Sequence, residues 1–236
     1  SVTCPEFLKE GTAVEDFMPR DRVVIGSDPG EEDAAAAVAR LYEPLGGEIL
    51  RTDVASAEMI KLASNAFLAT KISFINEIAN VCEEVGADVG EVARGMGADT
   101  RIGSSFLRAG IGYGGSCFPK DVSALKMLAG NTGYHFQLLT SVIEVNELQK
   151  HRVVGTLEKR AAKLVLGDGR AKGTDVGPLI NPRAVDKVER YIAVGTGEGA
   201  TLRMGGKRAT GKGLEHGYFF QPTIFTGVKA LSRLEQ

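Results

Sequence analysis

Cys117 stands where its thiol could act as a nucleophile. It follows the glycine-rich residues 110–116 and precedes a helix that the sequence places at Pro119. Backbone N–H groups at the start of a helix stabilise a thiolate, and Lys120 adds positive charge beside it. Asp121 lies about one turn along the same face and could orient a water or hydroxyl next to the sulfur. Taken alone, Cys117 also fits the role of a small buried apolar side chain.

Two further pairs of polar side chains have spacings suited to binding negative charge. Lys61 and Asn65 are four residues apart on a predicted helix, so they share one face and could hold an oxyanion beside a reacting carbon. Arg101 and Arg108 bracket the entry to the glycine-rich residues and could clamp phosphates. Each of these four residues also has an ordinary interpretation as a solvated surface side chain, and spacing does not decide between the two.

Glycines 110, 112 and 115 also spell the G-x-G-x-x-G pattern of dinucleotide-binding loops. That fingerprint follows a strand, opens a helix and is trailed by an acidic residue about 20 positions later. Here the residues before the first glycine lack strand character, and residues 130–132 contain no acid. We therefore interpret the match as coincidental.

An α/β unit and a long helix are expected to precede these residues. Residues 22–26 and 48–52 read as short strands around a helix that Asp28 caps and that has Pro29 in its first turn. Neither Gly nor Pro interrupts residues 55–85, where apolar side chains recur at helical spacing. We predict one helix there of about 30 residues, or roughly 45 Å. Such a helix is typical of a spine between domains or across a dimer.

Shorter elements are expected along the rest of the chain. The patterns predict helices at 88–95, 119–129, 137–164 and 182–195, with strand-like pieces near 201–204 and 218–226.

Composition excludes several classes of function. The 236 residues include 28 Lys and Arg against 30 Asp and Glu, a net charge of -2, which gives no electrostatic drive toward nucleic acid or an anionic membrane. No apolar run reaches the roughly 18 residues that a membrane span needs. Three scattered cysteines predict neither a disulfide framework nor a metal site, and they favour a reducing cytoplasmic location.

Five motifs, in order, resemble the UDP-glucose/GDP-mannose dehydrogenase family. They occupy residues 5–17, 22–26, 57–67, 74–78 and 106–121, and the last reads Phe106-Leu-Arg-Ala-Gly-Ile-Gly-Tyr-Gly-Gly-Ser-Cys117-Phe-Pro-Lys-Asp121. The resemblance covers residues 1 to about 158.

The resemblance implies a reaction and a set of site residues. It implies oxidation of UDP-glucose to UDP-glucuronate with two NAD, through a thiohemiacetal and a thioester on Cys117. On that pattern Lys61 and Asn65 stabilise the oxyanion, while Asp121 and Glu6 assist water or proton transfer. The substrate contacts it implies are Phe7, Leu8, Lys9, Glu10, Arg101, Phe106, Leu107, Arg108, Gly112, Tyr113 and Gly114, with Arg101 reaching a partner subunit's site, and the cofactor contacts are Glu10, Cys117 and Lys120.

From about residue 160 the chain resembles aldehyde dehydrogenases instead. The matching runs are residues 161–169, 173–181 and 217–225, and no cysteine lies among them. We carry over no catalytic residue from that family. The sequence is therefore expected to be an incomplete, chimeric dehydrogenase, with the glycine-rich NAD-binding unit of the first family outside it.

The expected architecture has three parts. Residues 1–54 would be the trailing part of an NAD-binding α/β domain, residues 55–159 a mainly α central dimerisation domain with a long spine helix, and residues 160–236 an aldehyde-dehydrogenase-like α/β fragment whose folding the sequence does not establish. The expected partners are a nucleotide sugar, with UDP-glucose favoured, and a second copy bound through the 55–85 helix, but neither nucleic acid nor membrane.

Two alternatives to this oxidoreductase remain open at the level of sequence. One is a non-catalytic helical dimerisation module, which needs only an apolar stripe on the 55–85 helix. The other is an NAD-dependent aldehyde dehydrogenase in which Cys117 serves small aldehydes. Whether the isolated chain is an enzyme is left open by these patterns, and we predict no turnover without the glycine-rich NAD-binding motif.

Overall fold

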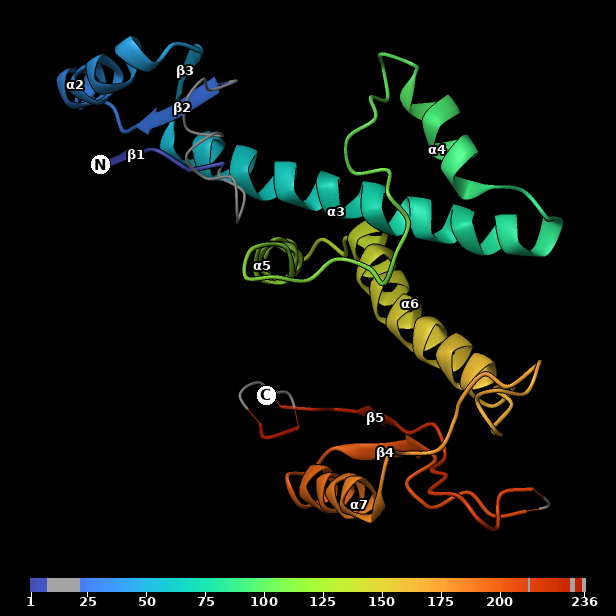
Figure 1. The fold of residues 1–236 in the computed structure, drawn as a ribbon. Coiled ribbons are helices and arrows are strands. Elements are labelled where there is room, and N and C mark those ends of the chain that lie inside the picture. Colours follow the sequence, from blue (N-terminus) through green and yellow to red (C-terminus); the bar gives the residue numbers. More distant parts are fainter. Residues whose placement is uncertain (8–21, 212, 230–231, 235–236) are drawn as a thin grey trace. The chain divides into compact units, whose positions relative to one another are not determined.

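The structure, a computed structural model, describes residues 1–7, 22–211, 213–229 and 232–234 (Figure 1). The chain divides into two compact units, Ser1–Lys150 and His151–Gln236. Among the described residues, no helix combines the length and apolar character that crossing a membrane requires. About half of the chain is helical, with one long helix and two small sheets, as the sequence patterns predicted in outline.

A small three-stranded sheet opens the first unit. Its strands are β1 (Val2–Thr3), β2 (Arg22–Ser27) and β3 (Glu48–Thr52), in the order β1-β2-β3. β2 and β3 run parallel, as expected for a strand–helix–strand unit, whereas β1 adds an antiparallel edge that the sequence did not indicate. Val23, Val24 and Ile25 of β2 are fully buried, so this strand forms the centre of the unit's smaller core.

Helix α2 (Glu32–Tyr42) covers this sheet through small side chains. Ala35 and Ala39 are buried against Val23 and Ile25, because alanine lets the helix backbone approach the strand closely. The predicted start at Asp28 and Pro29 is wrong. Those residues form a turn, with the Asp28 carboxylate 2.7 Å from the N-terminal amino group, and the helix begins three residues later without a side-chain cap. The short 3-10 helix η1 (Glu43–Leu45) then leads to β3.

Helix α3 (Val54–Val85) is the predicted long helix, with 32 residues. Asp53 caps its start, because its carboxylate accepts both the hydroxyl and the backbone N–H of Ser56. These two hydrogen bonds lower the pKa of the Asp53 carboxyl. Gly86 ends the helix in the left-handed conformation, with φ +74°, which glycine adopts without steric cost. Figure 1 shows the three-stranded sheet at its N-terminal end and α4 beside its C-terminal half.

Three more helices come next after α3 in the described chain. They are α4 (Val89–Gly97), which Asp88 caps, α5 (Phe118–Asn131) and α6 (Gln137–Ala161). The larger core lies where α3, α5 and α6 meet, and its buried members are Ala66, Ala69, Tyr113, Val122, Leu125, Leu139 and Val142.

The second unit is a smaller α/β assembly. Helix α7 (Pro182–Gly197) starts at Asn181, whose side chain accepts the N–H of Ala184, and it packs against β4 (Thr201–Met204). β4 pairs antiparallel with β5 (Ile224–Thr226). The strand-like pattern of 218–226 is regular strand only in its last three residues. The residues before it contribute an isolated bridge between Arg208 and Phe220.

Leu139 tests the packing of the larger core. The side chain of Leu139 is 1% exposed between α3 and α5, whereas that of its neighbour Leu138 is 61% exposed. We expect Leu139→Ala to lower the free energy of unfolding by about 2–5 kcal/mol, because it leaves a cavity. Leu138→Ala, the matched control, should change it by no more than about 0.5 kcal/mol. Urea denaturation followed by circular dichroism measures both, and equal losses would contradict this packing.

Candidate active site

Cys117 occupies the N-cap position of α5. Its backbone is in the right-handed helical region, its carbonyl accepts the N–H of Asp121 at 2.9 Å, and Pro119 occupies the first turn. The thiol does not cap the helix. It is partly buried, with its Sγ 3.6 Å from the hydroxyl of Ser116. The sulfur therefore sits at the N-terminal end of a 14-residue helix.

A buried hydrogen bond ties α3 to α5 beside this cysteine. The Nδ2 of Asn65 donates to the Oδ2 of Asp121 at 2.6 Å, and both side chains are more than nine-tenths buried. The other carboxylate oxygen of Asp121 lies 3.9 Å from the exposed ammonium of Lys120. The structure thus brings together two predicted site residues that are 56 positions apart in the chain.

Lys61 holds the N-terminal segment against α3. Its ammonium donates to the main-chain carbonyl of Glu6 at 2.5 Å and lies 5.5 Å from the centre of the Phe7 ring. The guanidinium of Arg22 lies 4.4 Å from the same ring and reaches the hydroxyl of Ser64. Sequence reasoning missed Arg22, which reads there as an ordinary charged residue opening a strand. The predicted contacts Leu8, Lys9 and Glu10 lie outside the described residues.

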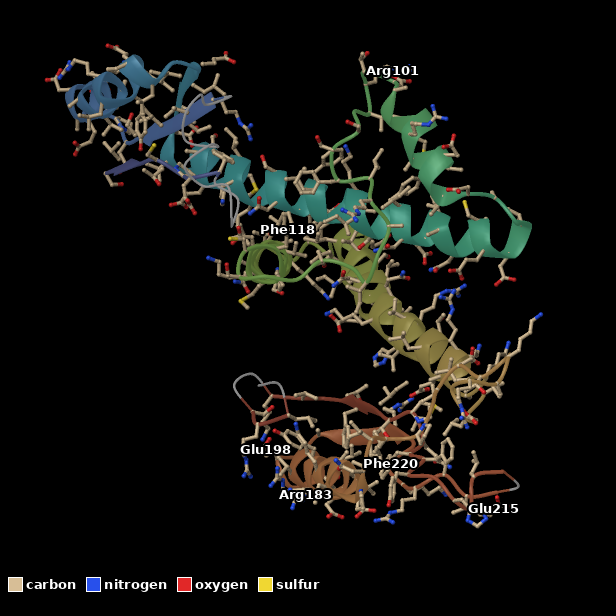
Figure 2. All side chains as sticks on the ribbon, viewed as in Figure 1. Arg101, Phe118, Arg183, Glu198, Glu215 and Phe220 are labelled. Atoms are coloured by element: carbon tan, nitrogen blue, oxygen red, sulfur yellow. The ribbon has the colours of Figure 1, made fainter. Side chains whose placement is uncertain are left out.

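Arg101 points away from this site in its own chain. It pairs with Asp99 at 2.6 Å, which raises the pKa of the guanidinium and lowers that of the carboxyl. Its side chain is 87% exposed at the outer end of the loop after α4, well apart from Phe118 beside the cysteine (Figure 2). Lys71 of α3 donates to the carbonyls of Ile102 and Gly103 and so supports the loop.

Aromatic packing shapes the residues on both sides of Cys117. The rings of Phe106 and Tyr113 each meet the Phe118 ring edge to face at 6.1 Å. Phe106 is the one described non-glycine residue with positive φ, +65°, a strained conformation that tends to occur at functional sites. The side chains of Leu107 and Tyr113 are buried, and burial raises the pKa of the Tyr113 hydroxyl.

The remaining predicted contacts lie on the surface of the same loop. Arg108 and Gly114 are exposed, and Gly112 is partly buried with φ +109°. This loop does not follow a strand in the described chain, and two of its N–H groups, those of Gly110 and Tyr113, donate to asparagine side chains. It is therefore not built as a pyrophosphate cradle, which needs unpaired N–H groups aimed at the ligand.

The turn after β2 does not fit the pyrophosphate of a dinucleotide either. The N–H of Gly30 donates to the Glu32 carboxylate, and four acidic side chains crowd the start of α2, namely Asp28, Glu31, Glu32 and Asp33. Negative charge at this position repels phosphate.

Two family comparisons match the first unit. Residues 55–148 match the central domain of the UDP-glucose/GDP-mannose dehydrogenase family, and residues 1–46 match the NAD binding domain of the same family. Residues 130–236 match the aldehyde dehydrogenase family, so the two assignments overlap at residues 130–148, from the end of α5 into the first half of α6.

Individual relatives agree with these matches. A UDP-glucose 6-dehydrogenase of Bacillus subtilis strain 168 is 52% identical over 178 residues, which are 75% of this chain and 37% of that protein. A second from the same organism is 59% identical over 150 residues, or 64% of this chain and 34% of the relative. The solved structure of a UDP-glucose dehydrogenase from the hyperthermophilic archaeon Pyrobaculum islandicum superposes with a TM-score of 0.66 at 40% identity, covering 70% of this chain and 39% of that one. The chain spans well under half the length of these relatives.

The Asn65–Asp121 bond can be tested apart from catalysis. We expect Asn65→Ala to lower the free energy of unfolding by about 1.5–3 kcal/mol, because it leaves the buried carboxylate of Asp121 without its amide partner. Adding Asp121→Ala should cost little more, since the group left unpaired is then gone. A double-mutant cycle by urea denaturation measures the coupling. Additive losses from the two substitutions would show that the bond does not form.

Proposed function

Because residues 1–46 and 55–148 of the chain belong to the UDP-glucose/GDP-mannose dehydrogenase family, we propose that it carries the catalytic centre of an oxidoreductase that converts UDP-glucose to UDP-glucuronate. The sugar C6 alcohol is first oxidised to the aldehyde, and a second oxidation then gives the acid. The observation that supports this most is the meeting of Cys117, Asn65 and Asp121 at the first turn of α5.

The Cys117 thiolate forms the covalent intermediates. It attacks the C6 aldehyde, so that a C–S bond forms and the carbonyl oxygen becomes an oxyanion that takes a proton. NAD, when bound, accepts the hydride at each of the two oxidations. The second oxidation leaves a thioester, and water then displaces the thiolate, which releases the carboxylate and restores the cysteine.

Lys61 and Asn65 stabilise the oxyanion in this scheme. One N–H of the Asn65 amide is committed to Asp121, which fixes the amide's orientation and leaves its second N–H to donate to the developing charge. Lys61 lies about one turn before Asn65 on α3, and its ammonium is held by the hydrogen bond to the Glu6 carbonyl. Asp121 has one oxygen left to orient the hydrolytic water, and the exposed carboxylate of Glu6 assists proton transfer.

The nucleotide sugar lies along the segments that flank this centre. We assign its contacts to Phe7, Leu8, Lys9, Glu10, Phe106, Leu107, Arg108, Gly112, Tyr113 and Gly114. Leu107 contributes main-chain groups, because its side chain is buried, whereas Tyr113, whose N–H and carbonyl both bond to Asn146, shapes the loop that carries these contacts. Arg101 serves the site of a partner subunit, which suits its exposure and its separation from Phe118 of its own chain in Figure 2. Glu10, Cys117 and Lys120 contact NAD.

A homodimer through α3 accounts for an exposed apolar stripe on that helix. Met59, Phe67, Phe74, Val81 and Val85 are 42–70% exposed, and their spacing of seven or eight and then four residues keeps them on one face. Large apolar side chains in one row of a surface helix are typical of an interface.

The protein combines parts of two dehydrogenase families in this proposal. The segment that matches aldehyde dehydrogenases, residues 130–236, contains no cysteine, and Cys117 lies upstream of it. We therefore assign the chemistry to the first unit alone. The cysteines among the described residues are free, and a nucleophilic thiol requires the reducing conditions of the cytoplasm.

Substrate binding is tested by protection of Cys117 from iodoacetamide. UDP-glucose at ten times its Kd should slow alkylation of Cys117 about tenfold, while Cys4 in the same chain serves as an internal reference. Arg108→Ala should weaken the protection, whereas Arg40→Ala, an exposed arginine on α2, should not. Alkylation of Cys117 at an unchanged rate in saturating UDP-glucose would rule out the proposed substrate.

Turnover is read separately from NADH absorbance with UDP-glucose and NAD. We expect no NADH from the chain by itself, since the described residues do not form a pyrophosphate cradle. NADH that disappears in Cys117→Ser would show that the chain holds NAD after all, and it would support the role of the thiol.

The dimer is tested by replacing both exposed phenylalanines of α3. Phe67→Glu with Phe74→Glu places like charges on both sides of the interface, and sedimentation velocity at micromolar concentration should then report a monomer. Leu148→Glu, which charges an equally exposed position on α6, should leave the dimer intact. A wild-type chain that already sediments as a monomer would rule out this interface.

A further inference from the structure

The residues before Cys117 are held by side-chain amides rather than by secondary structure. Residues 110–114 belong to neither a helix nor a strand. Four of their backbone groups bond to amides from two helices. Asn76 of α3 accepts the N–H of Gly110 at 2.7 Å, and Gln149 of α6 donates to the Gly110 carbonyl at 2.8 Å. Asn146 of α6 accepts the N–H of Tyr113 at 2.7 Å and donates to its carbonyl at 3.1 Å.

These three amides are buried to an extent that is unusual for such polar side chains. Asn76 is fully buried, Asn146 is 3% exposed and Gln149 is 7% exposed. Burying an amide costs free energy unless it is hydrogen-bonded. Asn76 nevertheless leaves its Nδ2 without a partner in the described structure, while its Oδ1 serves Gly110. Stability alone does not account for an asparagine whose amide is only half hydrogen-bonded in the core. The hydrogen bond between Asn76 and the loop therefore needs a further reason.

A second contact fixes the orientation of one of the amides. Asn80 of α3 donates to the Oε1 of Gln149 at 3.2 Å, which leaves the Nε2 end of Gln149 facing the loop. The arrangement also requires a glycine at position 112. A Cβ there would lie 2.4 Å from the Oδ1 of Asn146, and the backbone φ is +109°.

The held segment ends four residues before the nucleophile. Tyr113, the last residue bound by an amide, packs its ring edge to face on Phe118, the residue after Cys117. Both ends of the short stretch 114–117 are therefore anchored, one by Asn146 and the other by the Tyr113–Phe118 contact and the start of α5. Figure 2 shows Phe118 at this end of α5, beside α3.

We propose that Asn76, Asn146 and Gln149 form an amide clamp of positioning residues. The clamp sets the main-chain path of residues 110–114, which belong to the substrate-binding loop, and through that path it sets the position of the Cys117 sulfur. The clamp does not touch the reacting atoms. Its effect on the rate is large, because displacing a reacting group by about 1 Å can lower the rate up to a hundredfold. Its relevance to catalysis rests on the proposed function, whereas its effect on the cysteine does not.

The test compares alkylation of Cys117 with that of Cys4 in the full chain, without substrate. Asn146→Leu and Asn76→Leu release the loop, and we expect the Cys117-to-Cys4 ratio of iodoacetamide rates to rise about tenfold, since the loop no longer shields the thiol. Global unfolding would expose both cysteines and the buried Cys82, so modification of Cys82 identifies a variant that has merely lost its fold.

Ser73→Ala is the matched control. The Ser73 hydroxyl donates to the Val142 carbonyl at 3.0 Å across the same pair of helices without touching the loop, so this variant should keep the wild-type ratio. If the leucine variants do not fold, Gln149→Ala removes one bond to Gly110 and should raise the ratio to a smaller extent.

Two further results would overturn the proposal or separate it from the function. An unchanged Cys117-to-Cys4 ratio in folded Asn146→Leu and Asn76→Leu would overturn the clamp, as would an equal rise in Ser73→Ala. A raised ratio in a chain whose wild type UDP-glucose does not protect would support the clamp while ruling out the proposed substrate.

Discussion

The site depends on a row of buried polar side chains on one face of α3. Asn65, Ser73 and Asn76 are each more than nine-tenths buried, and each bonds to a different neighbour: the Asp121 carboxylate, the Val142 carbonyl and the Gly110 N–H. Apolar contacts would hold these segments together without fixing their register, because the hydrophobic effect is not directional. Directional bonds from a single rigid helix fix α5, α6 and the glycine-rich loop against one common reference, and the cysteine is positioned by all three.

Local signals made the elements predictable from sequence. The uninterrupted apolar periodicity before Gly86 gave α3, and Asp88 marked the start of α4, because capping and glycine conformations are decided within one helical turn. The start of α2 was misjudged because Asp28 and Pro29 favour a helix start locally, whereas the Glu31 N–H donates to the Asp28 carbonyl in a turn and the helix begins at Glu32. β1 is only two residues long and exists through its pairing with β2, which no local pattern encodes.

The partners in the site were harder to predict than its members. Cys117, Asn65 and Asp121 could be named from residue type and spacing, but the bond from Asn65 to Asp121 joins positions that only tertiary packing brings together. The contacts of the Asn146 and Gln149 amides were harder still to predict. On an amphipathic helix they read as solvated side chains, and their burial becomes visible only when the loop is seen beside them.

Helix α6 offers a physical reason why two family resemblances can meet in one chain. The buried residues of α6 are Leu139, Val142, Asn146 and Gln149, all in its first half. Beyond them, up to Ala161, no side chain is fully buried, although Glu158 pairs with Arg203 at 2.7 Å, so packing constrains the sequence there less than in the first half. Backbone hydrogen bonds within a helix form whatever the side chains are, and a change of sequence family past the last core-facing residue disturbs no packing in the first unit. The core around α3 therefore constrains the sequence of α6 more tightly up to Gln149 than beyond it.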